Sequence, residues 1–325
     1  MKKRKKEKRE SLKQIVLGSG CNYGLLCVFI MCFGSTSFAQ STSSEILKFS
    51  EASEEGTSVQ VVSWNIQMLP NALGLFSGAL RKKQRIRAPW IIAHCIEASY
   101  DVIVFQEVFD RDIKRKLKKE LKAAYPYQVD TRMAKGRLTS NGIFIVSRIP
   151  MKYIDHVTYE KGAHEDAWAA KGCTLVEVEK EGHKFQIAGT HLQSGSSKDA
   201  EKHRGLQYQD IRNLLDKNAD KTIPVLVMGD MNTRKTNVPK YTQMVETIGV
   251  KDFPLDEENP YTIDNQNSWN EHDQGIQLDY VFLQKRTTQT TIEEQKVLRL
   301  KGNHKGKQID LADHYGIVAK LLLLP

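Results

Sequence analysis

Short apolar segments recur along most of the chain, and many of them have the length and pattern of β-strands. The segment 102–105 is apolar at every position, as a strand covered on both faces should be. The segment 59–65 is also predicted to be a strand, and it ends in a polar residue. Further strand patterns occur at residues 142–147, 173–179, 184–190, 225–228, 278–283 and 317–323.

Three segments show the longer apolar spacing that is typical of helices, at residues 79–98, 111–124 and 201–218. Pro89 lies inside the first of them, and we expect it to break or restart that helix because proline lacks an amide proton. The chain has no internal repeat and no long linker, which favours one domain. Strands outnumber helices, so two packed sheets covered by helices fit better than one doubly wound sheet.

The N-terminus has the pattern of an export signal. Basic residues are followed by an apolar run at 25–33 and by small residues at Ser37 and Ala39. We therefore predict a cleaved signal peptide at 1–39 and a secreted or periplasmic product. A membrane anchor is the alternative, but the apolar run is shorter than the ~20 residues that span a bilayer.

Residues 40–57 are rich in Ser, Glu and Thr, and we expect them to form a flexible lead-in to a domain at 58–325. The net charge of +9 first suggests a nucleic-acid partner, but residues 1–14 carry +6 of it and leave +3 for the rest. No nucleic-acid partner is therefore expected. Cys95 and Cys173 remain after cleavage, and we expect both to be buried thiols.

Polar residues stand at the ends of most predicted strands, where a rigid sheet can hold functional groups in place. These positions carry Asn65, Glu107, His191, Asp230, Asn232, Asp279, Asp313 and His314. The oxygen donors suit a hard cation such as Mg²⁺, and two histidines without a cysteine partner do not form a structural zinc site. A hard cation beside carboxylates and imidazoles indicates phosphate-ester hydrolysis. A single strand-terminal Asp or Asn is commonly a turn residue, so this prediction depends on the whole set.

The order of these motifs resembles that of the endonuclease/exonuclease/phosphatase superfamily over residues 59–323. The motifs are Trp64-Asn65, Gln106-Glu107, Thr190-His191-Leu192, Gly229-Asp230-Met231-Asn232, Leu278-Asp279-Tyr280 and Asp313-His314. The resemblance implies a deoxyribonuclease-I-like α/β fold, a four-layered αββα sandwich in which two packed, mostly antiparallel sheets are flanked by helices. It also implies a phosphoesterase that uses Mg²⁺ or another divalent cation such as Mn²⁺ or Co²⁺.

Three details are similar to the neutral, bacterial-type sphingomyelinases. The motif Glu107–Asp110 is close to one of theirs, in which an Asn stands at the position of Gln106. Thr190–Gln193 is the second detail. The third is Asp166 followed by Lys171, which those enzymes carry in a loop near the site, so that Lys171 would approach the substrate phosphate. By this resemblance the chain hydrolyses sphingomyelin, or a related sphingophospholipid, to ceramide and phosphocholine or the matching phospho-head group.

The resemblance also implies individual roles for the residues at the strand ends. Glu107, Asn65 and Asp313 would form the metal site. Asp230 and Asn232 would orient the attacking water and a phosphoryl oxygen, with Asp230 also able to act as a base.

The two motif histidines receive separate roles by the same resemblance. His314 would be the general acid or base, positioned by Asp279 or by Asp313. His191 would donate to the phosphorus centre or to the departing alkoxide. Proton donation matters because a lipid alkoxide is a poor leaving group, and a positioned donor typically contributes ~10²–10⁴-fold.

Two other functions stay open on the sequence alone: a secreted nuclease of the same superfamily and a lipid-binding protein without activity. An enzyme acting on sphingophospholipids in membranes needs peripheral contact with the bilayer, and we expect it to be a monomer. Some sphingomyelinases have an aromatic hairpin for this contact, but residues 283–314 contain no aromatic residue other than histidine. The apolar residues Leu73, Leu75 and Phe76 are the alternative contact, unless they pack onto the following helix.

Overall fold

The structure is a computed structural model that describes residues 56–70, 77–131, 135–160, 162–255, 258, 260–270, 274–286 and 290–324. The predicted signal peptide at 1–39 and almost all of the lead-in at 40–57 lie outside these residues. Leu73, Leu75 and Phe76 lie outside them too. No helix of the described part is both long enough and apolar enough to cross a membrane.

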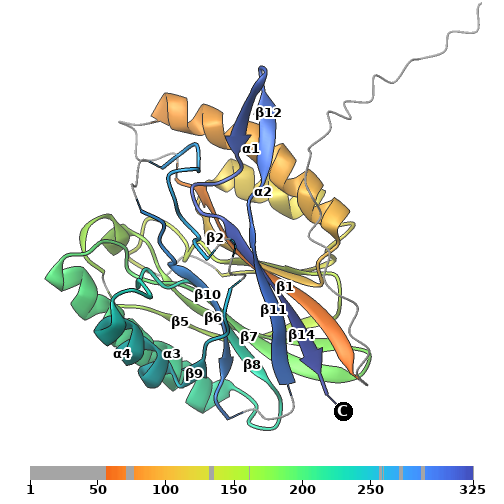
Figure 1. Ribbon diagram of the computed structural model, residues 1–325, viewed down its shortest axis with the longest axis vertical. Helices are drawn as coiled ribbons and strands as arrows, with labels where there is room; N and C mark the ends of the chain where they lie inside the picture. The colour runs from red at the N-terminus through yellow and green to blue at the C-terminus, as the bar shows by residue number, and fades with distance from the viewer. Residues whose placement is uncertain are drawn as a thin grey trace, which may run out of the picture. The chain divides into compact units, whose positions relative to one another are not determined.

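Two mixed six-stranded sheets form the centre of the described part (Figure 1). The first sheet has the strand order β11 (Thr290–Leu298), β14 (Gly316–Leu323), β1 (Thr57–Met68), β2 (Val102–Val108), β4 (Phe144–Ser147) and β3 (Tyr127–Asp130). The second has the order β5 (Met151–Thr158), β6 (Gly172–Lys180), β7 (His183–His191), β8 (Val225–Asp230), β10 (Asp279–Gln284) and β9 (Val250–Lys251). The pairs β1–β2 and β7–β8 are parallel, and the other neighbouring pairs are antiparallel. A separate hairpin consists of β12 (Lys301–His304) and β13 (Lys307–Asp310).

Helices cover the outer face of each sheet. They are α1 (Ser77–Ala98), α2 (Arg111–Glu120), α3 (Lys198–Asn218) and α4 (Val238–Ile248), and a short 3-10 helix, η1 (His164–Trp168), lies between β5 and β6 in the chain. Ile91 of α1 and Leu117 of α2 lie in one apolar cluster with the first sheet, and Ile211 of α3 and Met244 of α4 lie in another with the second sheet. A third cluster fills the space between the sheets. These four layers confirm the predicted αββα fold class.

The structure differs from the sequence prediction at Pro89, which neither breaks nor restarts the first helix. α1 is one continuous helix with Pro89 inside it. Pro89 is exposed, whereas the neighbouring Ala88 and Ile91 are fully buried. Tertiary packing of this buried face holds the helix together despite the missing hydrogen bond.

Cys95 and Cys173 are free, buried thiols, as predicted. Cys95 belongs to the apolar cluster beneath α1 and α2, and Cys173 to the cluster beneath α3 and α4. The two sheets therefore separate the thiols, and they cannot form a disulfide with each other in this fold.

The alternation of side chains along the central strands determines where their polar ends point. Val59 and Val61 of β1 lie in the cluster between the sheets, whereas Val62 and Trp64 lie beneath the helices. Continuing this period of two places Asn65 on the inner face. The same alternation of side chains along β7, β8 and β10 places three further polar residues on the inner faces: His191, Asp230 and Asp279.

Candidate active site

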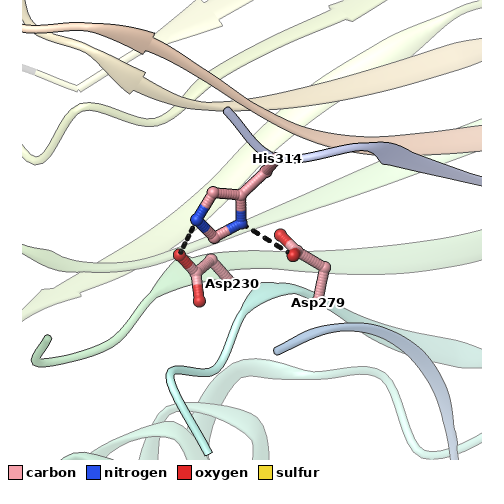
Figure 2. Close-up of side chains that lie close together, drawn as sticks. All are labelled: Asp230, Asp279 and His314. Atoms are coloured by element: carbon pink, nitrogen blue, oxygen red, sulfur yellow. Dashed lines mark hydrogen bonds and ion pairs between the residues drawn. The ribbon is translucent and has the colours of Figure 1, made fainter. Parts of the chain in front are cut away.

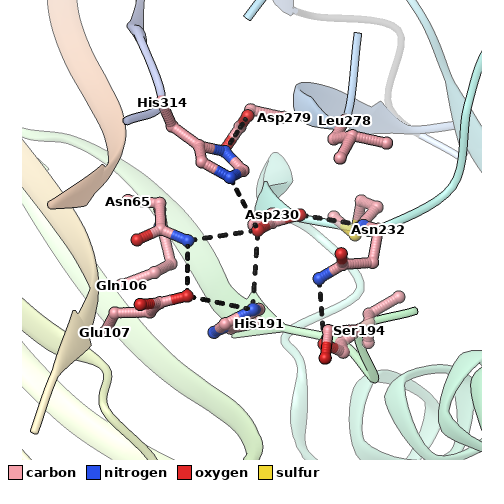
Figure 3. Close-up of polar contacts among 12 residues, drawn as sticks. Asn65, Gln106, Glu107, His191, Ser194, Asp230, Asn232, Leu278, Asp279 and His314 are labelled. Atoms are coloured by element: carbon pink, nitrogen blue, oxygen red, sulfur yellow. Dashed lines mark hydrogen bonds and ion pairs between the residues drawn. The ribbon is translucent and has the colours of Figure 1, made fainter. Parts of the chain in front are cut away.

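The polar strand ends meet at one end of the sandwich, where the apolar cluster between the sheets stops. Figure 3 shows this convergence of Asn65, Glu107, His191, Asp230, Asp279 and His314. The first sheet supplies the ends of β1 and β2 and the segment before β14. The second sheet supplies the ends of β7 and β8 and the start of β10. The site therefore joins the two sheets.

Asp230 lies at the centre of the cluster and has 2% of its surface exposed. Its Oδ2 accepts a hydrogen bond from Nδ2 of Asn65 at 3.1 Å. The same oxygen lies 3.5 Å from Nε2 of His191 and 3.8 Å from Nε2 of His314. Its Oδ1 accepts the backbone N–H of Asn232 at 2.9 Å. One carboxylate oxygen thus faces both imidazoles, while the other holds the turn that follows β8.

His314 forms a bridge between two carboxylates (Figure 2). Its Nδ1 donates to Oδ2 of Asp279 at 2.8 Å, and its Nε2 points toward Asp230. Burial favours the neutral imidazole, but the carboxylates of Asp279 and Asp230 outweigh this effect and raise the pKa of His314 well above its usual value. The two carboxylates therefore favour the protonated imidazole, with one ring nitrogen fixed and the other directed into the site.

His191 lies on another side of Asp230 and shares a hydrogen bond with Lys171. Nζ of Lys171 is 3.1 Å from Nε2 of His191, 2.8 Å from Oδ1 of Asp166 and 2.9 Å from the carbonyl oxygen of Leu192. Burial and the Lys171 charge lower the pKa of His191 to about 3, although the Asp230 carboxylate acts in the opposite direction. His191 is therefore neutral near pH 7, and its Nε2 accepts the hydrogen bond from Lys171.

Asp166 holds the chain segment that follows β7. Its Oδ2 accepts the backbone N–H of Ser194 at 2.7 Å and the Ser194 hydroxyl at 2.9 Å. Its other oxygen pairs with Lys171, of which 4% is exposed. The two residues that the sequence selected in a loop therefore form a buried ion pair that connects η1 to the site.

A bulge in the first sheet turns Glu107 toward the cluster. The pairing of β1 with β2 shifts register between Asn65 and Met68, and both Gln67 (φ 49°) and Glu107 (φ 59°) leave the extended conformation. Bulges commonly re-aim side chains next to active sites. Nδ2 of Asn65 donates to Oε1 of Glu107 at 3.1 Å. Burial, followed by the Asp313 carboxylate, raises the pKa of Glu107 to about 7.

Gln67 and Arg87 complete this side of the site, and the sequence analysis selected neither. Nε2 of Gln67 donates to Oδ2 of Asp313 at 2.5 Å. Arg87 of α1 is buried and donates to the backbone carbonyl of Gln67 at 3.0 Å. Burial lowers the pKa of Arg87 to about 10, so it stays charged and acts on Asp313 and Glu107. In the sequence Arg87 is one of several basic residues at 81–87, and no local feature distinguishes it from the others.

The close pairing of β7 with β8 depends on a glycine within β8. Gly229 has a φ of 152°, and a Cβ atom there would lie 1.9 Å from the backbone oxygen of Thr190 on β7. A side chain at this position would separate the two strands that carry His191 and Asp230. Asn232 also has a positive φ, of 47°, and its Nδ2 donates to the carbonyl oxygen of Leu192 at 3.2 Å.

The predicted metal ligands fit a divalent cation in two respects. Oδ1 of Asp313 is buried and has no hydrogen-bond partner among the described residues. The repulsion between the Glu107 and Asp313 carboxylates, seen in the raised pKa of Glu107, would be relieved by a cation. Asn65 directs its Nδ2 toward Glu107, and its Oδ1 accepts the backbone N–H of Gln67. Asn65 thus holds the Glu107 carboxylate in this arrangement.

A second group also has the spacing of a metal site. Asp230, Asp279 and His314 present ligand atoms that lie within 4.8 Å of one another. Both ring nitrogens of His314 already face carboxylates, however, so this group is arranged to hold a proton on the imidazole. The contacts described above link all ten residues that the sequence predicted for the site.

Comparison of the chain with known proteins finds a matching family, similar sequences and solved structures with the same fold. The family model described as the Endonuclease/Exonuclease/phosphatase family matches residues 62–298. Sphingomyelinase C of Leptospira interrogans is 32% identical over 261 residues, which are 73% of this chain and 46% of that protein. The chain therefore spans about half the length of this relative.

Solved structures of beta toxin from Staphylococcus aureus have the same fold. One has a TM-score of 0.69 and 26% identity, and the match covers 80% of this chain and 99% of that one. A beta-toxin mutant with bound magnesium ions has a TM-score of 0.66 and 25% identity, and the match covers 81% of this chain and 99% of that one.

Proposed function

Because the chain belongs to the endonuclease/exonuclease/phosphatase family, we propose that it is a phosphodiesterase of the phospholipase C type. Its substrate would be sphingomyelin or a related sphingophospholipid, and its products ceramide and phosphocholine or the matching phospho-head group. The observation that carries the proposal is the single oxygen of Asp230 that faces Asn65, His191 and His314. The similarity to sphingomyelinase C and to beta toxin supports a sphingolipid substrate.

Hydrolysis forms a bond from a water oxygen to phosphorus and breaks the bond from phosphorus to the ceramide oxygen. The water loses a proton and the departing alkoxide gains one. Because Asp279 holds Nδ1 of His314, only Nε2 of this ring can exchange a proton with the reactants. We assign general acid–base catalysis to His314 and the orientation of the water to Asp230, which lies beside that nitrogen.

The phosphoryl group would be held from the side of His191 and Asn232. The Lys171 ammonium has three donors, which now go to Asp166, Leu192 and His191. A phosphoryl oxygen that took over the third hydrogen bond would free Nε2 of His191 from its donor, and in the tautomer with the proton on Nε2 the ring could donate to the phosphoryl group or to the departing alkoxide. Asp166 would keep Lys171 in place during this exchange.

Glu107 and Asp313 would hold a divalent cation, with Asn65 fixing the Glu107 carboxylate. Mg²⁺ is the first candidate, with Mn²⁺ or Co²⁺ as substitutes, because these ligands are oxygen atoms. When bound, such a cation neutralises charge on the phosphoryl oxygens and lowers the pKa of water. The magnesium ions in the similar beta-toxin structure support this assignment.

The enzyme would work outside the cytoplasm, secreted or periplasmic after removal of residues 1–39, as a monomer with peripheral contact to the membrane. Contact with the membrane would come from the surface around the site. The hairpin of β12 and β13 leads directly into Asp313 and His314, and its tip exposes Lys305 and Lys307. This position supports the hairpin as one contact.

A turnover assay separates the three functions that the sequence left open. Residues 40–325 are incubated with Mg²⁺ and either sphingomyelin vesicles or DNA, with EDTA controls, and phosphocholine and ceramide are quantified. We expect EDTA-sensitive release of both products. Cleavage of DNA without cleavage of lipid would replace the proposal with a nuclease. Vesicle binding without any turnover would indicate a lipid-binding protein.

A further inference from the structure

A pocket with a volume of about 310 Å³ opens beside the candidate active site. Its lining includes Asn232, Leu278, Glu201, Arg204, Arg234 and Lys240, and we call it the Arg234 pocket. Asn232 and Leu278 border the catalytic cluster as well, as Figure 3 shows. A group attached to a phosphate at the site could therefore enter this pocket, whose volume suffices for a small polar head group.

The charges that line the Arg234 pocket are mainly positive. Arg204 is buried and donates to the carbonyl oxygens of Gln193 and Gly195. Lys240 lies 3.6 Å from the carboxylate of Glu201, the single acidic side chain of the lining. Arg234 is exposed, and its guanidinium makes no hydrogen bond or ion pair to any residue that the structure describes. Arg234 thus offers free donors to a ligand.

Two helix starts add to this positive potential. The lining includes Ser196, just before the N-cap of α3 at Ser197, and Asn237, which is the N-cap of α4. The N-terminal end of a helix carries a partial positive charge and free backbone N–H groups. The two helix starts therefore add a partial positive charge to the side-chain donors of the pocket.

This lining is unsuited to a choline group. Trimethylammonium groups are bound by the open faces of aromatic rings, often several together. The one aromatic residue of the pocket lining is Tyr208, which is 2% exposed and whose hydroxyl shares a hydrogen bond of 2.6 Å with Thr233. A cation would also meet Arg234 and Lys240. Hydroxyl groups, by contrast, would find charged donors in Arg234 and Lys240 and an acceptor in Glu201.

We propose that the Arg234 pocket receives the head group of the substrate and selects hydroxyl-rich head groups of the inositol type over choline. Arg234 is the residue that determines this selectivity, because it supplies free donors at the pocket wall. The inference rests on the proposed phosphodiesterase activity, since it places the substrate phosphate beside Asn232. It ranks the proposed substrates, with sphingophospholipids that carry a polyol preferred over sphingomyelin.

The test compares two substrates, ceramide phosphoinositol and sphingomyelin, in the same vesicles of otherwise uncharged lipid. The ratio of kcat/KM for the two lipids is measured in competition for the wild type, Arg234→Gln and Lys217→Gln. Lys217 is an exposed lysine near the C-terminal end of α3, so its variant controls for the loss of one positive charge. We expect the wild type to prefer the inositol lipid and Arg234→Gln to lower this preference about tenfold, as for one lost hydrogen bond to a charged group. The Lys217 variant should keep the wild-type ratio.

A wild type that prefers sphingomyelin, or an Arg234→Gln variant that loses activity equally on both lipids, would overturn the inference. Binding of soluble inositol 1-phosphate and phosphocholine to the protein, measured by calorimetry, gives a readout that needs no turnover. We expect inositol 1-phosphate to bind more tightly and to lose this advantage in Arg234→Gln; equal binding of the two would also overturn it. If neither lipid is cleaved while this binding difference persists, the proposed function fails and the pocket assignment stands.

Discussion

The side chains of Asp279 and His314, which lie 35 positions apart in the chain, meet at the end of the sandwich with 2.8 Å between Oδ2 and Nδ1. Asp279 begins β10 of the second sheet, whereas His314 comes just before β14 of the first. The hydrogen bond therefore ties the sheets together at the point where the core ends. It also fixes which nitrogen of His314 points at Asp230.

From this arrangement we expect His314→Ala to lower kcat on sphingomyelin by about 10²–10⁴-fold, the usual contribution of general acid–base catalysis. Asp279→Asn should give a smaller loss, because the imidazole stays in place but loses the carboxylate that fixes its proton. Single-turnover kinetics measure both. Thermal unfolding serves as the control, and near-wild-type turnover of folded His314→Ala would remove His314 from the reaction.

The sequence predicted the central strands and the helices α1, α2 and α3, and it missed α4, β5, β11 and the β12–β13 hairpin among other elements. The central strands were predicted because they are short apolar runs, as strands covered on both faces should be, and the polar residues were found because they stand at the ends of those runs. β5 was missed because its side chains are half-buried or exposed, without a clear alternation. The β12–β13 hairpin was missed because it is mostly polar and exposed.

The same limit applies within the site. Motifs predicted the residues at strand ends, but Gln67 and Arg87 reach the site through tertiary geometry. Gln67 depends on the bulge between β1 and β2, where φ becomes positive. Arg87 depends on α1 packing across the first sheet, which places its guanidinium against the Gln67 carbonyl. No local pattern in the sequence encodes either contact.

Glu107→Gln should weaken the response to Mg²⁺ while preserving the fold. The substitution keeps the shape of the side chain but removes the negative charge that a hard cation requires. We expect at least a tenfold higher Mg²⁺ concentration for half-maximal activity, and weaker Mg²⁺ binding by calorimetry. Glu179→Gln, at an exposed position of β6, is the matched control. An Mg²⁺ titration that is the same for both variants would place Glu107 outside the metal site.

Lys171→Met should reduce turnover of lipid by roughly 10²–10³-fold if Lys171 donates to the phosphoryl group in the transition state. The single change also leaves the partly buried Asp166 carboxylate without its cation, which destabilises the fold. The double variant Lys171→Met with Asp166→Asn removes both charges and restores stability. If that folded double variant hydrolyses sphingomyelin at the wild-type rate, the pair has only a structural role.

His94 makes the stability of the fold depend on pH. It is buried on α1, its Nε2 lies 3.1 Å from the Tyr100 hydroxyl, and burial lowers its pKa from 6.5 to about 4. Between these values the unfolded chain binds a proton that the native protein does not, so stability falls as the pH drops from 6.5 to 4. The full effect is about 3 kcal/mol.

Urea unfolding at several pH values measures this dependence. We expect His94→Gln to flatten the fall in unfolding free energy between pH 6.5 and pH 4, because Gln carries no titrating group. His156→Gln, at an exposed position of β5, should keep the wild-type slope. Equal slopes for the wild type and His94→Gln would assign the acid sensitivity to other residues.

The β12–β13 hairpin predicts an electrostatic contact with the membrane in place of an aromatic one. Lys305 and Lys307 are exposed at its tip. Gly302 packs so closely against the Trp90 ring of α1 that a Cβ there would overlap it, and this contact anchors the hairpin. Each lysine near an anionic surface contributes about 1 kcal/mol, so Lys305→Gln with Lys307→Gln should weaken binding to phosphatidylserine vesicles roughly thirtyfold. The effect should shrink in high salt because ions screen it. Hydrolysis of a short soluble phosphodiester should be unchanged, and equal losses on vesicles and on that substrate would assign these lysines to the site itself.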